Sequence, residues 1–325
     1  MTGSHLPSGT AIAAEASRSR QRRPLTWQRA LRATAPYLLV LPIVLAIGAI
    51  LGYPLYDLVR LSFQKYGLFE LIRHSGTWVG LDNYRSVLGD QVFWHTLVRT
   101  TVFTIVNVTL TMVIGTLIAL LLVRLTVVVR VLLTSGLVLV WSMPVVVAVQ
   151  VWYWMTNFQN GVLNYTLTQL HLGDFSQHDW YGDTTSQLGM VTTLIVWGAL
   201  PFVVVTVYAG LAQVPRELVE AAEVDGARPW RVFRDVTFPV LKPILLILTS
   251  LSIIWDFGVF AQPYLLIDPA KLHASNYLMA IYLFEEGYGR SDFGRGAAIS
   301  VLMLVLVAVM SVFYVRKMVR LGDVA

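Results

Sequence analysis

A run of 27 residues, Leu97-VRTTVFTIVNVTLTMVIGTLIALLL-Val123, carries one charged side chain, that of Arg99, close to its start. A helix of about 20 mostly apolar residues is long enough to cross the hydrocarbon core of a bilayer. The whole chain is 56% apolar and 13% charged, with a mean hydropathy of +0.65, which is too apolar for a soluble protein of 325 residues. The sequence therefore predicts an all-α integral membrane protein.

Five further apolar segments are long enough to span a membrane, so six transmembrane helices are expected. These segments are Pro36–Leu55, Val131–Met155, Leu188–Leu211, Val240–Gln262 and Gly294–Val315. Pro144 and Pro201 are expected to kink two of the helices. The segment before the first span, the loops after the second and fourth spans, and the segment after the sixth span together hold 16 of the 24 Lys and Arg residues, with Lys242 counted in the loop that precedes its span. The loop 156–187, on the other side of the membrane, has none. The positive-inside rule then places both termini in the cytoplasm.

The N-terminal segment and the rest of the composition indicate the domain organisation and exclude several kinds of site. Residues 1–34 form an Arg-rich polar segment that predicts a disordered basic cytoplasmic tail, whereas residues 35–325 form one six-helix transmembrane domain. The absence of cysteine excludes disulfides and cysteine-based metal sites, and all six histidines lie outside the predicted spans, so no metal is expected. The net charge of +5 follows from membrane topology, so no nucleic-acid partner is expected.

The predicted cytoplasmic loop between the fourth and fifth spans reads Gln213-VPRELVEAAEVDGARPWRVFRDVTF-Pro239. Pro215 suits the first turn of a helix, where its missing N–H costs nothing, and Gly226 can adopt the left-handed conformation that ends one. A second short helix is expected over Pro229–Val236, closed by Pro239 before the fifth span. The loop is therefore predicted to be two short helices joined by a tight turn.

The first of these helices has the character of a docking surface. Ala221 and Ala222 leave a small, smooth patch that another protein could approach closely. The alternative is an amphipathic helix that lies on lipid headgroups. Four acidic side chains within ten residues favour a protein partner over anionic lipid; they are Glu217, Glu220, Glu223 and Asp225.

The spacing in this loop resembles the EAA motif of permease subunits from binding-protein-dependent ABC sugar importers of the maltose and glycerol-phosphate type. In that motif Glu-Ala-Ala is followed after three residues by Gly. After nine further residues come an apolar residue, one residue of any kind, a second apolar residue and then Pro. The matching residues, which the resemblance implies contact an ATPase, are Glu220, Ala221, Ala222, Gly226, Val236, Phe238 and Pro239.

The resemblance extends over most of the chain, with one departure. The family pattern is matched at the start of the second span, around the end of the third span and at the start of the sixth. The matching stretches and residues are Gly80–Thr101, Pro144, Trp152, Gly161, Asn164 and Phe293–Leu302. After the fifth span the family's Gly-Gly-Pro turn is replaced by Ile267-Asp268-Pro269, so an inherited role for that loop is in doubt.

The resemblance implies a type I importer permease in the plasma membrane of a bacterium. Its partners would be a second homologous permease, two ATPase subunits that hold ATP and Mg²⁺ at the cytoplasmic face, and an extracytoplasmic sugar-binding lipoprotein. The cargo would be a sugar, such as the disaccharide trehalose. None of the four lysines follows a glycine, so the chain lacks a P-loop and is expected to be a transport subunit without cofactor rather than an enzyme.

A sugar path needs aromatic faces and hydrogen-bond partners for hydroxyl groups. Asp256 is the only acidic residue well inside a predicted span, and its charge should face the protein interior or water. It is predicted to accept sugar hydroxyls or gate the path, or alternatively to pair with a polar group of the second permease. The other path candidates, which could equally be packing residues, are Trp255, Asn107, Gln150 and Trp197.

Two rival functions remain open from the residues. An ion-coupled secondary sugar transporter would require several intramembrane ionisable groups, and Asp256 alone is thin support. The same ABC role could also serve glycerol phosphate or another oligosaccharide.

Overall fold

A computed structural model describes residue 37 and residues 39–322 of the chain, with residues 317–322 described by their backbone alone. The chain divides into two compact units, residues 1–57 and 58–325. In the first unit the described residues form one helix, which contains a π-helical turn, η1 (Gly48–Gly52), and continues into α3 (Tyr53–Ser62). The predicted tail at residues 1–34 lies outside the described residues.

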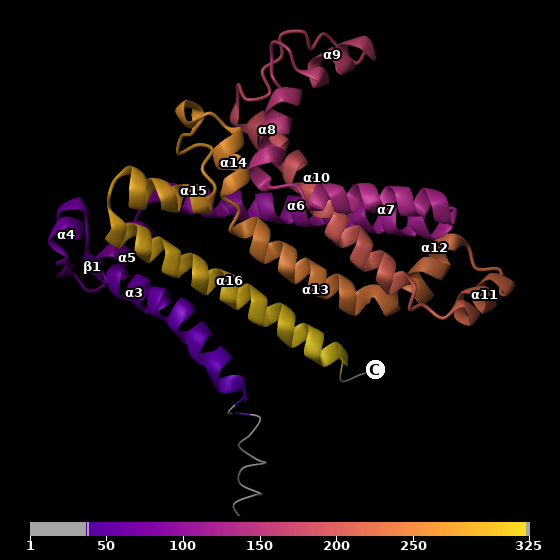
Figure 1. Cartoon of the computed structure of the whole chain (residues 1–325), viewed down its shortest axis with the longest axis horizontal. Helices are drawn as coiled ribbons and strands as arrows, with labels where there is room; N and C mark the ends of the chain where they lie inside the picture. The colour runs from indigo at the N-terminus through magenta and orange to yellow at the C-terminus, as the bar shows by residue number, and fades with distance from the viewer. Residues whose placement is uncertain (1–36, 38, 323–325) are drawn as a thin grey trace, which may run out of the picture. The chain divides into compact units, whose positions relative to one another are not determined.

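In the described part of the chain, five helices are long and apolar enough to cross a membrane. They are Leu39–Ser62, α6 (Gln91–Arg124), α10 (Thr184–Leu211), the helix Pro229–Phe257 and α16 (Phe293–Gly322). All but the first belong to the second unit, where α6, α10, α13 (Phe238–Phe257) and α16 form the bundle seen in Figure 1. α6 begins six residues earlier than predicted, because Asp90 caps it by accepting from the Val92 N–H at 2.8 Å.

The predicted span Val131–Met155 bends at Pro144 much more sharply than a kink, although its two halves together are still long and apolar enough for one span. The segment forms two helices, α7 (Val127–Trp141) and α8 (Val145–Met155), whose axes differ by 103°. Pro144 lies at the break, since it cannot donate the hydrogen bond needed to continue a helix. α8 therefore leaves the bundle, and Figure 1 shows it beside α14 (Ala261–Leu266), with α9 (Val162–Gln169) beyond it. By contrast, α10 runs without interruption through Pro201.

The predicted closure of the loop at Pro239 is wrong. After α11 (Arg216–Val224), a helix runs continuously from Pro229 through α12 (Pro229–Val232), a π-helical turn η2 (Phe233–Thr237) and α13. Pro239 is the second residue of α13 and follows the π-helical turn, in which the Phe238 N–H donates to the Phe233 carbonyl. The helix ends at Phe257 rather than Gln262, with Gly258 as its cap.

Short elements close the end of the bundle opposite α11. Strands β1 (Gln64–Lys65) and β2 (Thr77–Trp78) pair antiparallel on either side of α4 (Leu68–Arg73), and α5 (Asp82–Leu88) precedes α6. The 3₁₀ turn η3 (Pro269–Lys271), α15 (Met279–Phe284) and the π-helical turn η4 (Glu285–Gly289) then lead into α16.

The interface between α6 and α10 forms the centre of the bundle. α6 faces inward with a line of small and polar residues three or four positions apart, which share one face of a helix. These buried residues are Thr96, Thr100, Thr104, Asn107, Thr111, Gly115 and Ala119. A Cβ atom at Gly115 would lie 2.6 Å from Cγ1 of Val203, so glycine is required for this close helix approach.

Candidate functional site

The loop helices are built by local capping chemistry. α11 begins directly after Pro215, and Gly226 ends it with a φ of +74°, which confirms the predicted left-handed turn. The Ala227 N–H donates to the Ala222 carbonyl at 3.0 Å, and the Gly226 N–H donates to that of Glu223 at 3.0 Å. This pair of bonds is a Schellman motif, which holds α11 at a defined angle to the following helix.

The predicted coupling residues lie on one short platform, α11 to the start of α13. Glu220, Ala221 and Gly226 are exposed, and Ala222 is half-buried. In the second helix Val236 is half-buried, whereas Phe238 and Pro239 are exposed.

Large apolar side chains on the same platform are also uncovered. Trp230 is 71% exposed, Val224 is 87% exposed and Leu218 is 53% exposed. Clustered exposed apolar side chains are typical of interaction surfaces.

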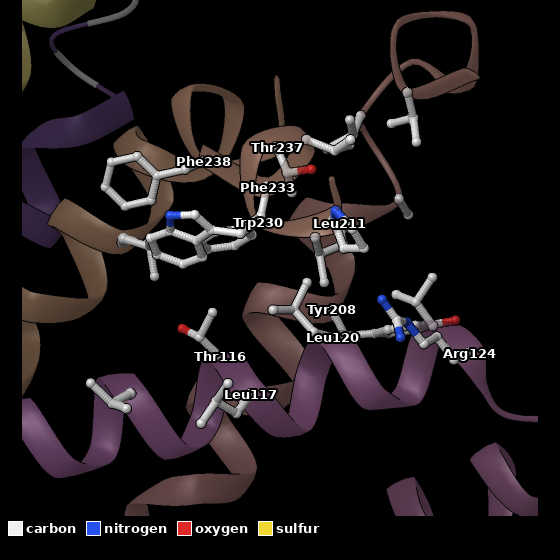
Figure 2. A pocket seen from close by; sticks show the side chains of 18 of the residues that line it. Thr116, Leu117, Leu120, Arg124, Tyr208, Leu211, Trp230, Phe233, Thr237 and Phe238 are labelled. Atoms are coloured by element: carbon white, nitrogen blue, oxygen red, sulfur yellow. The ribbon is translucent and has the colours of Figure 1, made fainter. Parts of the chain in front are cut away.

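Behind the platform lies a groove of about 1180 Å³, drawn in Figure 2. One wall is α6, from Met112 to Arg124, and the opposite wall is formed by Phe238 and Leu245 of α13. Figure 2 shows Thr116, Leu117 and Leu120 of α6 across the groove from Trp230, Phe233 and Phe238, with Tyr208 of α10 beside Leu120. The groove therefore lies between the loop helices and the C-terminal part of α6.

Arg130, at the start of α7, joins three helices beside this groove. Its guanidinium donates to the carbonyls of Leu122 at 3.0 Å and Leu125 at 2.8 Å, at the C-terminal end of α6. It also donates to the Tyr208 hydroxyl at 3.1 Å and lies over that ring, 5.6 Å from its centroid. A cation is favourable at a helix C-terminus, where carbonyls are left unpaired. Sequence reasoning missed this residue.

The candidate path residues lie on four helices, α6, α8, α10 and α13, and differ in burial. Asp256 is 7% exposed, and its carboxylate has no hydrogen-bond or ion-pair partner among the described residues. Asn107 is fully buried, with its Nδ2 donating to the Phe103 carbonyl at 2.8 Å and its Oδ1 unpartnered within the described chain. Gln150 is exposed on α8, and Trp197 is half-buried and packs against Trp152.

Trp255 belongs to an aromatic cluster that the sequence did not reveal. Its ring lies 5.6 Å from that of Phe202 in α10, which in turn stacks on Trp141 at the end of α7, 6.1 Å away. Trp255 is 54% exposed and Trp141 is 59% exposed. Three helices thus contribute to one exposed aromatic face, the kind of surface on which a sugar ring can stack. The residues are 114 positions apart at the extremes, so no local pattern signals the cluster.

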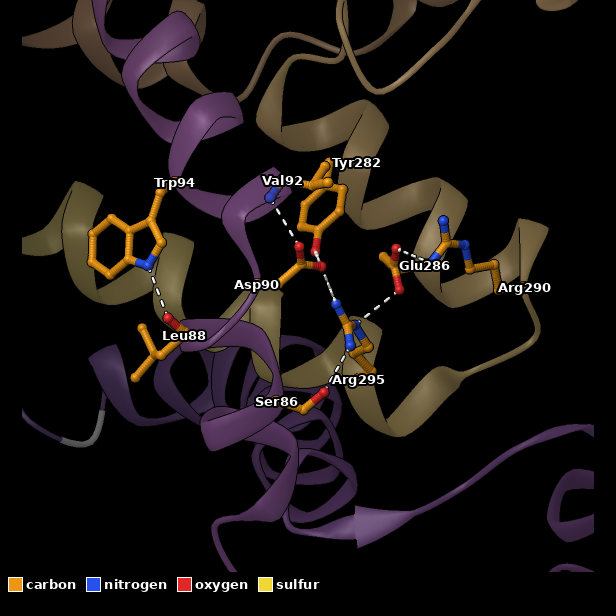
Figure 3. A network of polar contacts seen from close by, with 9 residues as sticks. All are labelled: Ser86, Leu88, Asp90, Val92, Trp94, Tyr282, Glu286, Arg290 and Arg295. Atoms are coloured by element: carbon orange, nitrogen blue, oxygen red, sulfur yellow. Dashed lines mark hydrogen bonds and ion pairs between the residues drawn. The ribbon is translucent and has the colours of Figure 1, made fainter.

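At the other end of the bundle a polar network joins the starts of α6 and α16, shown in Figure 3. Arg295 contacts the Asp90 carboxylate and donates to Ser86 Oγ at 2.7 Å. Its Nε lies 2.9 Å from Glu286 Oε2, an ion pair without hydrogen-bond geometry, and Arg290 contacts the other oxygen of Glu286 at 2.9 Å. Burial raises the pKa of Glu286, and the two arginines oppose that rise.

The segment that replaces the family's Gly-Gly-Pro turn is well ordered by its own side chains. Ile267 is buried, and Asp268 accepts from the Ala270 N–H at 2.9 Å. Lys271 donates to Asp179 at 2.9 Å, which ties the turn to the loop before α10. The Asp268 side chain caps this turn, so the turn does not require a glycine.

Comparison with known proteins agrees with this architecture. The chain is 42% identical over 290 residues, 89% of its length and 88% of the relative, to the diacetylchitobiose uptake system permease protein DasB of Streptomyces coelicolor. It is 30% identical over 86% of its length to the trehalose/maltose transport system permease protein MalF of Thermococcus litoralis, covering 92% of that protein. Its fold matches a chain of a bacterial ABC transporter for alginate import with a TM-score of 0.75 at 17% identity, covering 90% of this chain and 98% of that one.

The family model for binding-protein-dependent transport system inner membrane components matches residues 111–319, from the middle of α6 to the last turns of α16. This is well over half of the chain, and it includes the loop platform, the broken pair of helices and the aromatic face. The chain is therefore a multi-pass membrane protein that belongs to the family of binding-protein-dependent transport system inner membrane components.

Proposed function

We propose that this chain is the permease subunit that forms half of the translocation path of an ABC sugar importer, with the loop 213–239 facing the cytoplasm. The observation that carries the proposal is the platform of α11 and α12. Its motif residues Glu220, Ala221 and Gly226 are exposed on helices held by a Schellman turn. A short, stiff lever of this kind can convey nucleotide-driven closure of an ATPase to the bundle as a rigid-body movement.

The proposed complex contains a second homologous permease, two ATPase subunits and an extracytoplasmic sugar-binding lipoprotein. ATP and Mg²⁺ belong to the ATPases, and this chain holds no cofactor. A related complex supports the binding-protein partner, because an alginate ABC transporter with a fold similar to this chain was solved in complex with an alginate pentasaccharide-bound periplasmic protein.

The proposed cargo is an uncharged disaccharide. Trehalose is the first candidate, from the resemblance to SugA, the permease of a mycobacterial trehalose importer, and from the trehalose/maltose permease among the relatives. Diacetylchitobiose is the competing candidate, because the relative at 42% identity is named for it. Glycerol phosphate or another oligosaccharide is the alternative cargo for the same role.

Along the path, Asp256 is proposed to accept sugar hydroxyls or gate passage, and Trp255 to stack against the sugar ring. Asn107, Gln150 and Trp197 are secondary candidates on α6, α8 and α10. An Asp256→Ala variant is expected to assemble normally but to lose most sugar-stimulated transport. Transport at the wild-type rate would remove Asp256 from the path.

The coupling role can be tested in proteoliposomes that contain the assembled complex. Glu220→Lys and Gly226→Pro should each abolish ATP-driven uptake of labelled trehalose or diacetylchitobiose, while membrane insertion is unchanged. Glu217→Lys makes the same charge change on the same helix outside the motif, so it should reduce uptake less than Glu220→Lys does. Wild-type uptake by either motif variant would contradict the docking role.

The rival ion-coupled mechanism makes an opposite prediction in the same vesicles. Uptake by an ABC importer should require internal ATP and persist when an uncoupler dissipates the ion gradients. Uptake that stops with the uncoupler and continues without ATP would establish a secondary transporter instead.

A further inference from the structure

The groove behind the loop platform has the dimensions of a lipid tail. Its α6 wall runs over the thirteen residues from Met112 to Arg124, a length of about 18 Å at 1.5 Å per residue. The α13 wall from Phe238 to Thr249 is about as long. One leaflet of a bilayer core is about 15 Å thick, half of the full 30 Å. Both walls are therefore long enough to reach through one leaflet.

The charged residues that line the groove are mostly positive. Arg124, Arg130 and Arg216 line it, opposed by one acidic residue, Glu223. Arg130 is committed to carbonyls of α6 and to Tyr208, but its positive charge remains. Arg124 and Arg216 are exposed and have no hydrogen-bond or ion-pair partner among the described residues. Two guanidinium groups are thus available for a phosphate, which they can bind with paired hydrogen bonds.

The acidic residues of α11 do not cancel this charge. The part of α11 that lines the groove carries Arg216, Val219 and Glu223, three and four positions apart on one face. Glu217 and Glu220 are not part of the lining. α11 is therefore divided between an acidic side for the ATPase and a side that closes the groove.

We propose that this groove binds one anionic phospholipid of the cytoplasmic leaflet. Its phosphate would lie between Arg124 and Arg216, and one acyl chain would lie against Leu117 and Leu120 of α6 and Leu245 of α13. Trp230, 71% exposed in the groove lining, occupies the headgroup level that tryptophan prefers. Basic pockets between transmembrane helices on this side of a membrane are suited to anionic headgroups.

A bound lipid would fill the space between the loop platform and α6, and would support the lever that the proposed function requires. The site itself depends only on the membrane orientation of the loop. Lipid binding and transport have separate readouts, so failure of either proposal leaves the other testable.

The full complex is purified in nanodiscs that contain equal amounts of phosphatidylglycerol and phosphatidylcholine. Native mass spectrometry then measures the mass of the complex, with any bound lipid, after it is released from the nanodisc. Wild type should retain phosphatidylglycerol in preference to phosphatidylcholine. The double variant Arg124→Gln, Arg216→Gln should bind phosphatidylglycerol about 30-fold more weakly, because each cation near an anionic lipid contributes about 1 kcal/mol. The matched control Arg228→Gln, Arg231→Gln removes two exposed arginines of the same loop outside the groove and should bind as wild type does. Equal retention of both lipids, or equal loss in the control, would overturn the site.

A photo-crosslinker identifies the occupant directly. With p-benzoylphenylalanine in place of Leu117, irradiation of the complex should add the mass of one phosphatidylglycerol to this chain. A crosslink to the second permease would show that protein fills the groove, and would overturn the lipid site.

Discussion

Replacing Arg295 by glutamine should destabilise the fold at the end of the bundle opposite the loop. The Arg295 side chain is 17% exposed and joins α16 to Asp90 at the start of α6 and to Glu286 in η4. Glu286 is 4% exposed, so loss of its partner would leave a nearly buried carboxylate. Removing one member of a buried ion pair costs about 3–5 kcal/mol. Because Arg290 still contacts Glu286 at 2.9 Å, we expect the lower part of that range or slightly less, about 2–3 kcal/mol.

The assay is thermal unfolding of the purified complex in nanodiscs, followed by tryptophan fluorescence. Arg295→Gln should lower Tm by roughly 5–10 °C on the scale of soluble domains. Adding Glu286→Gln should recover at least half of this loss, because the uncompensated charge is then gone. Arg290→Gln is the control: its side chain is 69% exposed, so it should cost less than about 1 kcal/mol.

The loss of Tm in Arg295→Gln should also depend on pH. Burial raises the pKa of Glu286, with Arg295 and Arg290 lowering it and Asp90 and Asp292 raising it further. Without Arg295 this pKa should rise more, so the folded state would bind a proton more tightly than the unfolded state. A carboxyl with a raised pKa contributes stability at low pH that is lost as pH rises through the folded pKa. The Tm deficit of Arg295→Gln should therefore shrink between pH 8 and pH 5.5. An unchanged Tm, a deficit independent of pH or no recovery in the double variant would refute the reasoning.

Three further substitutions and one control test the packing of the bundle and the loop platform by Tm and by ATP-driven uptake in proteoliposomes. Gly226→Ala forces alanine to a φ of +74° and should cost about 1–2 kcal/mol and reduce uptake; wild-type uptake and Tm would contradict the requirement for the Schellman turn. Gly115→Ala places a Cβ 2.6 Å from Val203 and should cost about 1–3 kcal/mol, whereas Gly136→Ala, with open space around it, should be neutral or stabilising. Arg130→Gln removes the cap of α6 and should cost about 1–3 kcal/mol; a Tm equal to that of wild type would show that the carbonyls find water instead.

Local chemistry makes most of the loop predictable from its residues. Pro215 and Gly226 set the start and end of α11, since a missing N–H and a left-handed φ act within a single turn. The second loop helix was predicted with the wrong end, because a proline after a π-helical turn occupies the first turn of α13 and need not stop the helix. Pro144 was predicted to kink its helix, but a break of 103° depends on α8 packing against α14, far away in the sequence.

The candidate path was less predictable. Asp256 and Trp255 are neighbours in sequence, but successive residues on a helix point about 100° apart, and one is buried while the other is exposed. The polar line on α6 has a spacing of three and four that could have been found from sequence, whereas the aromatic face of Trp141, Phe202 and Trp255 could not.

By itself the sequence determined that the chain crosses a membrane several times and carries an exposed two-helix loop. Both properties follow from the length of apolar runs and from capping residues, which act over a few positions. Only the tertiary structure decided that Arg295 meets Asp90, 205 positions away, and that arginines of α6, α7 and α11 surround one groove. Contacts of this kind depend on how helices pack, and local sequence patterns do not specify which surfaces of different helices will face each other.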